Sequence, residues 1–151
     1  MGCADSIDHS EEMVARLKAD GKSYYDELIS DQKYDYFLDR IEEGDDVLIR
    51  NVYLLTPWVD ASTSTSLRYS LSRALVHNPD AVMSLVPEYF SITDICTIPY
   101  IEAPIDVELE HVNVSIKALE SISNSGHVEC LAIYKKLRAD ITRKIQSTLV
   151  L

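Results

Sequence analysis

The residues best suited to metal chemistry are Glu108 and His111. They lie three positions apart in a segment of helical periodicity, so both side chains fall on one face of a predicted helix. Di-iron helical bundles use two such Glu-x-x-His motifs with two further glutamates, and this chain has one. Val112 belongs to the apolar face, which places His111 at the edge of the core. The sequence predicts no metal site and no cofactor, and a metal-dependent helical enzyme stays an alternative.

The chain lacks the sequence motifs that are typical of serine hydrolases and of nucleotide-binding proteins. The chain has no G-x-S-x-G motif, no P-loop and no glycine-rich dinucleotide turn. The serines of residues 61–66 (ASTSTS) fit a polar hinge and a helix cap, and acidic pairs fall at predicted helix ends, where solvated carboxylates are ordinary. The sequence predicts no catalytic residue and a non-enzymatic protein.

Cysteine usage indicates a disulfide. Cys96 lies in an irregular, proline-containing segment over residues 87–104, and Cys130 lies in the last predicted helix. A Cys96–Cys130 disulfide would tie the two together and stabilise the fold by about 3–4 kcal/mol on a chain-entropy argument. Two buried free thiols are the alternative. The disulfide interpretation implies an oxidising compartment.

The opening MGCADS has three interpretations. Cys3 is the lipidated first residue of a bacterial lipoprotein, with Met1 and Gly2 added by cloning; or Gly2 and Cys3 are both acylated, which places the domain on the cytoplasmic face of a membrane; or the chain is unmodified. A disulfide favours the first. We expect residues 1–9 to form a flexible tether and residues 10–151 a helical domain.

The formal net charge of −11 disfavours nucleic acid as a partner and disfavours electrostatic docking to an anionic membrane, which leaves a lipid anchor as the route to one. An acidic protein associates fastest with basic partners. The predicted partner-binding surface is the densest acidic run with one interleaved tyrosine: Asp31, Asp35, Tyr36, Asp39, Glu42, Glu43, Asp45 and Asp46.

The elements that position these residues read as helices. A chain of 151 residues with 46% hydrophobic content suits one domain with a substantial core. Ser10 is the expected cap of the first helix, and Asn78-Pro79 has the cap-then-proline pattern of a helix start. Helical patterns cover residues 11–20, 23–30, 31–44, 45–55, 66–77, 79–86, 105–122 and 127–149. The fold class is all-α, as a single-domain helical bundle or a short helical-repeat-like stack.

Residues 71–86 (LSRALVHNPDAVMSLV) and the later ICTIPYIE (95–102) resemble small helical bacterial exported proteins. These include immunity proteins of secreted antibacterial toxins, and the resemblance covers Leu71 to Glu102. It implies a periplasmic, non-enzymatic protein, in one form an outer-membrane lipoprotein. We therefore expect an immunity or inhibitor protein that occludes a basic toxin or enzyme. A structural or assembly lipoprotein of the bacterial envelope is the alternative.

Overall fold

Helices account for most of the described chain. The computed structural model describes residues 2–122 and 127–150, with side chains described over 9–122 and 127–149. The described residues form nine α-helices and one 3₁₀-helix, and they contain no strand. The predicted all-α, single-domain fold is confirmed.

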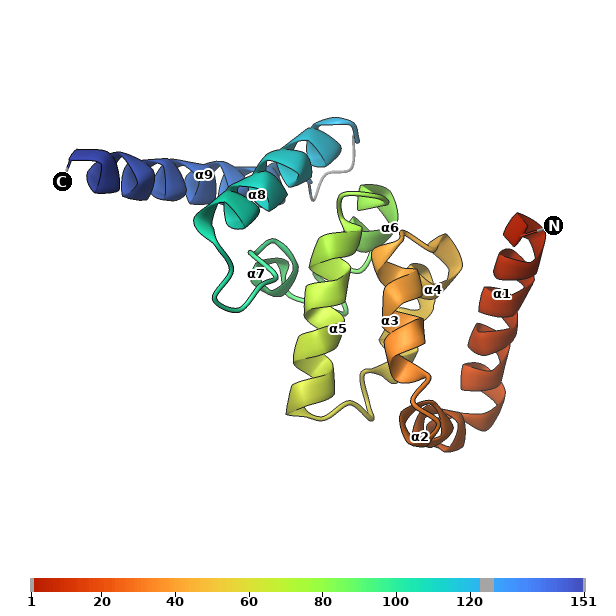
Figure 1. Ribbon diagram of the computed structural model, residues 1–151. Coiled ribbons are helices and arrows are strands. Elements are labelled where there is room, and N and C mark those ends of the chain that lie inside the picture. Colours follow the sequence, from red (N-terminus) through yellow and green to blue (C-terminus); the bar gives the residue numbers. More distant parts are fainter. Residues whose placement is uncertain (1, 123–126, 151) are drawn as a thin grey trace.

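The helices of the first half of the chain stand side by side. In Figure 1, α1, α3 with α4, and α5 form this row, α2 lies across one end of it and α6 at the other. The elements are α1 (Gly2–Asp20), α2 (Lys22–Ser30), α3 (Tyr34–Glu42), α4 (Asp46–Asn51), the 3₁₀-helix η1 (Val52–Leu55), α5 (Ala61–Ala74) and α6 (Pro79–Met83).

A helical hairpin completes the molecule. After the short helix α7 (Ile92–Ile95), helices α8 (Ile105–Glu120) and α9 (His127–Val150) pack against each other. This hairpin lies over α7 and the end of α5, and the C-terminal half of α9 extends away from α1 (Figure 1). None of the described helices combines the length and the apolar character needed to cross a membrane.

The core draws on most of the elements. In α3 the apolar side chains recur at helical spacing, so Tyr34, Phe37, Leu38 and Ile41 are all buried on one face. The largest side chains with almost no exposure are Leu28, Phe37, Ile41, Leu48, Ile49, Leu55, Leu67, Leu71, Leu75, Met83, Leu85 and Tyr134. This shared core fixes α5 between α3 on one side and the α8–α9 hairpin near its end.

The N-terminal region differs from its prediction. Helix α1 begins at Gly2, so the backbone of residues 2–9, predicted to be a tether, is helical. Ser10 is wrong as a cap: it is buried inside α1, and its Oγ donates to Asp45 Oδ2 at 2.5 Å. Cys3, the predicted lipidation residue, has its side chain outside the described ones, so its modification stays a prediction.

Two further boundaries also differ. Residues 61–66 are not a hinge but the first turns of α5, because Asp60 caps that helix in a reciprocal box with Thr63. The segment 45–55, predicted as one helix, divides into α4 and η1 at Val52. The predicted start at Asn78-Pro79 is confirmed, since Asn78 Oδ1 accepts a hydrogen bond from the backbone of Ala81.

Candidate functional site

The predicted acidic residues lie on α3, in the turn before it and at the start of α4. Asp31 follows α2, the next five residues belong to α3 or its end, and Asp45 and Asp46 begin α4. The exposed members are Asp31, Asp35, Tyr36, Asp39, Glu43 and Asp46. Tyr36 is 45% exposed and its ring lies beside that of His9, with 5.9 Å between ring centroids. Six of the eight predicted residues are thus exposed, with Asp35 and Asp39 beside a hollow toward α5 and Tyr36 beside a hollow toward α1.

Asp45 has an internal role. Its Oδ1 accepts from the backbone of Leu48 and so caps α4, while its Oδ2 accepts from Arg40 Nη2 at 2.7 Å. The side chains of Arg40 and Asp45 are only 17% and 10% exposed. Because Ser10 also donates to Oδ2, this carboxylate joins α1, α3 and α4.

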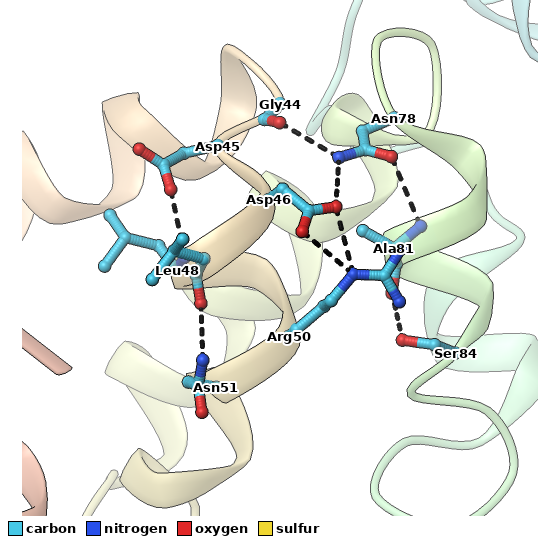
Figure 2. Close-up of polar contacts among 10 residues, drawn as sticks. Gly44, Asp45, Asp46, Leu48, Arg50, Asn51, Asn78, Ala81 and Ser84 are labelled. Atoms are coloured by element: carbon cyan, nitrogen blue, oxygen red, sulfur yellow. Dashed lines mark hydrogen bonds and ion pairs between the residues drawn. The ribbon is translucent and has the colours of Figure 1, made fainter. Parts of the chain in front are cut away.

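Asp46 forms part of a second junction, drawn in Figure 2. Its carboxylate accepts from Arg50 Nε at 3.0 Å and from Asn78 Nδ2 at 3.2 Å. The same Nδ2 donates to the backbone oxygen of Gly44 at 3.1 Å. Gly44 has a φ of +95°, and a Cβ there would lie 2.9 Å from His77 Cβ, so the turn needs glycine. Asn78 therefore caps α6 and holds the α3–α4 turn against it.

Two neighbouring hollows run along α5. The first, about 450 Å³, lies between α3 and α5 and has Asp35, Asp39 and Glu42 on the α3 side. The second, about 620 Å³, lies between the end of α5 and α8 and includes Asp106, Val107 and Glu110. Glu42 and Arg73 line both, so the hollows meet at these two residues.

Arg73 is held in place by several contacts where the two hollows meet. Its Nη1 donates to Glu42 Oε1 at 2.7 Å and its Nη2 donates to the backbone oxygen of Pro99 at 2.7 Å. Its guanidinium also lies 5.1 Å from the centre of the Tyr100 ring. A cation held over an aromatic face and in two charge-assisted contacts is strongly restrained. Arg73 therefore sets the positions of α3, α5 and the loop that carries Tyr100.

His111 is buried, contrary to the prediction of an edge position. It is 4% exposed, and its Nε2 lies 3.4 Å from Tyr134 Oη and 3.3 Å from Ser115 Oγ. Burial lowers the pKa of His111 to about 4, a backbone contact with Thr97 opposes this, and the charge of Arg73 adds to it. The ring is therefore neutral at pH 7.

Tyr134 connects this histidine to the rest of the core. Its Oη donates to the backbone oxygen of Thr97 at 2.9 Å and lies 3.3 Å from Ser72 Oγ. Burial raises the pKa of Tyr134, so the phenol stays protonated. Ser115 and His111 have the atom types of a nucleophile–base pair, but Ser115 is fully buried. The arrangement is a hydrogen-bonded core network that joins α5, α8 and α9.

The predicted disulfide is present. Cys96, which ends α7, and Cys130, in the first turns of α9, are bonded with 5.6 Å between their Cα atoms. Both residues are buried. In the described part of the chain, no three histidine, cysteine, aspartate or glutamate side chains gather as ligands for a metal ion. Among the described side chains, Glu108 and His111 have none of the further ligands that a di-iron site needs.

Sequence reasoning missed the acidic residues on the α8 side of the surface, together with Arg73. The sequence did contain one signal for the α5 side of this surface. Polar residues recur every three or four positions in a predicted helix and form a stripe beside the apolar one: Ser66, Ser70, Arg73 and His77. The position of α8 depends on tertiary packing, so Asp106 and Glu110 had no comparable signal. Comparison with protein families, with characterised proteins and with solved structures gave no match.

Proposed function

We propose that this protein is a non-enzymatic binding domain that recognises a basic protein, most specifically an immunity or inhibitor protein that occludes a toxin or enzyme in the periplasm. The observation that carries the proposal is the exposed acidic side chains of α3, where Asp35 and Asp39 form no ion pair among the described side chains and Tyr36 is also exposed. Opposite charge accelerates association with such a partner, and a tyrosine adds contact area.

The disulfide supports the proposed compartment. Structural disulfides persist in secreted and periplasmic proteins and are rare in the reducing cytosol. The Cys96–Cys130 bond is buried and joins two elements, which is the position of a structural disulfide. The resemblance of residues 71–102 to exported immunity proteins points the same way, and anchoring through Cys3 would keep the domain at the outer membrane.

The test is genetic, because the gene for an immunity protein lies beside the gene for the toxin that the protein neutralises. The gene is deleted alone and together with each adjacent gene, and growth in dense culture is measured. We expect the single deletion to impair growth and one double deletion to restore it. The purified product of that neighbour should then form a stable complex with this protein in size-exclusion chromatography with light scattering.

The same deletion strains distinguish an immunity protein from a structural or assembly lipoprotein of the envelope. A structural or assembly lipoprotein would be needed whatever the neighbouring genes encode. Sensitivity to detergent in the single deletion, unchanged in every double deletion, would contradict the immunity proposal and favour an envelope role.

A further inference from the structure

We infer that the two hollows along α5 form one groove that binds an extended, lysine- or arginine-containing segment of a partner protein. This inference rests on the proposed protein-binding function and names its site and the chemistry of its occupant. The groove is defined here by the side chains of both hollows, with Asp35 and Asp39 at one end and Asp106 and Glu110 at the other.

The shape of the groove suits a single extended strand of chain. On α5 and in the turn after it, the groove is lined by residues spaced three or four positions apart, which lie on one face of the helix: Ser66, Tyr69, Arg73 and His77. Ser66 and His77 are eleven positions apart, which at a helical rise of about 1.5 Å per residue is about 16 Å, and an extended peptide rises about 3.3 Å per residue. A segment of about five residues would therefore run from one end of the groove to the other.

Apolar side chains offer contact area within the groove. Tyr69 lines the α3 side above the buried Leu38, and Tyr100, Val107 and Val114 line the α8 side. Val107 is 37% exposed, and Ile101, the residue after Tyr100, is 77% exposed. Exposed aliphatic side chains beside aromatic ones are what a partner covers in an interface.

The charges of the groove side chains favour a positively charged occupant. The groove holds five carboxylates against one guanidinium: Asp35, Asp39, Glu42, Asp106 and Glu110 against Arg73. Glu42 is already paired with Arg73. Among the described side chains, no ion pair or hydrogen bond engages the other four carboxylates. Cationic side chains near each end would neutralise charges that the chain leaves uncompensated.

The middle of the groove is preorganised. Arg73 is held by Glu42 and by the oxygen of Pro99, and the Tyr100 ring packs edge-on to His111 with 5.8 Å between centroids. A surface that is already ordered loses little conformational entropy when a ligand binds. The partner's backbone would cross this rigid point, with its cations on either side.

The test measures binding of a fluorescein-labelled octapeptide of alternating arginine and valine to the whole protein by fluorescence anisotropy at low salt. Asp39→Asn with Glu110→Gln removes one charge from each end of the groove. Glu11→Gln with Glu120→Gln removes the same number of charges at exposed residues that lie outside the groove and outside the predicted acidic surface. We expect about a tenfold rise in Kd for the groove variant and less than twofold for the control. A charge-reversed peptide with glutamate in place of arginine should not bind.

Each other outcome overturns the inference. Equal weakening by the two variants would mean non-specific attraction to an acidic protein. No binding of the arginine peptide would mean that the groove does not accept such segments. A second copy of this chain could also supply basic side chains, because its α9 has five basic and two acidic residues. Analytical ultracentrifugation tests for such a dimer. If the unmodified protein dimerises and the groove variant does not, the second copy is the occupant. Because purified protein and a synthetic peptide are used, the result is independent of the genetic test of immunity.

Discussion

The imidazole of His111 is held neutral by its burial and by the nearby positive charge of Arg73. Its pKa is lowered from 6.5 to about 4, mainly by burial. A group with a depressed pKa stabilises the fold fully above its unfolded value and loses that contribution as the pH falls toward its folded value. We therefore expect the free energy of unfolding to fall by about 1.4 kcal/mol per pH unit between pH 6.5 and pH 4 on account of this residue.

Denaturant unfolding of the protein and of His111→Gln from pH 7 to pH 4 measures this effect. The variant keeps a hydrogen-bonding side chain and cannot take up the proton, so its unfolding free energy should depend less on pH. Acidic residues titrate in both proteins and cancel in the difference. His77→Gln, a change at an exposed histidine, should follow the unmodified protein. Parallel pH profiles for His111→Gln and the unmodified protein would contradict the assignment.

The phenol of Tyr134 forms hydrogen bonds with the backbone oxygen of Thr97 and with the buried side chains of Ser72 and His111. Tyr134→Phe keeps the ring and leaves the oxygen of Thr97 with one partner fewer. We expect a loss of about 1–3 kcal/mol in unfolding free energy, the usual cost of an unsatisfied buried group. Tyr36→Phe, at an exposed ring, should change it by less than about 0.5 kcal/mol. A loss no larger than that of the control would mean that solvent replaces the hydroxyl.

At the scale of elements, the turns after α3 and α5 are joined by the side chain of Asn78. It caps α6 and donates to Gly44 and Asp46 (Figure 2). Asn78→Ala removes the cap and both contacts at once, so we expect a loss of about 1–3 kcal/mol in unfolding free energy. Asn113→Ala, on an exposed position of α8, is the matched control. Thermal unfolding by circular dichroism checks both, and equal losses would show that the junction contributes little.

Features that depend on neighbouring residues were predictable from the sequence. The Asn78-Pro79 helix start and the apolar face of α3 follow from local rules, and both are present. Ser10 shows the opposite case, because its cap-like identity serves a contact with Asp45, 35 positions away. His111 is buried only because the α8–α9 hairpin closes over Thr97 and Ser72. The groove likewise depends on how α8 lies against α5, so the sequence alone predicted only its α3 side.

At the scale of the whole molecule, charge is divided unevenly. Helix α9 carries a net charge of +3, from five basic and two acidic residues, while the chain as a whole carries −11. The remainder therefore carries −14. The acidic groove lies on this remainder, between α3, α5 and α8. A basic partner that enters the groove meets the charge of Arg73 there, and the basic α9 disfavours an approach from its side.

The disulfide holds the hairpin to the rest of the fold. It joins the end of α7 to α9 across 34 positions of sequence, and one wall of the groove belongs to the same hairpin. Closing a loop of that length removes conformational entropy from the unfolded chain. We expect Cys96→Ala with Cys130→Ala to lower the free energy of unfolding by about 3–4 kcal/mol in denaturant titrations. The arginine–valine peptide should also bind the variant more weakly, because α8 loses one of its attachments.

Reduction gives an independent check on the same bond. A thiol reductant added to the unmodified protein should lower its unfolding free energy by the same amount as the double substitution. The reductant should have no effect on the substituted protein, whereas Cys3→Ala should respond to it as the unmodified protein does. An intact-mass count with two blocked thiols, mapped to Cys96 and Cys130, would agree with this. If reduction leaves the unfolding free energy unchanged, the packing of Tyr134 and His111 holds the hairpin in place, and the groove keeps its shape without the covalent bond.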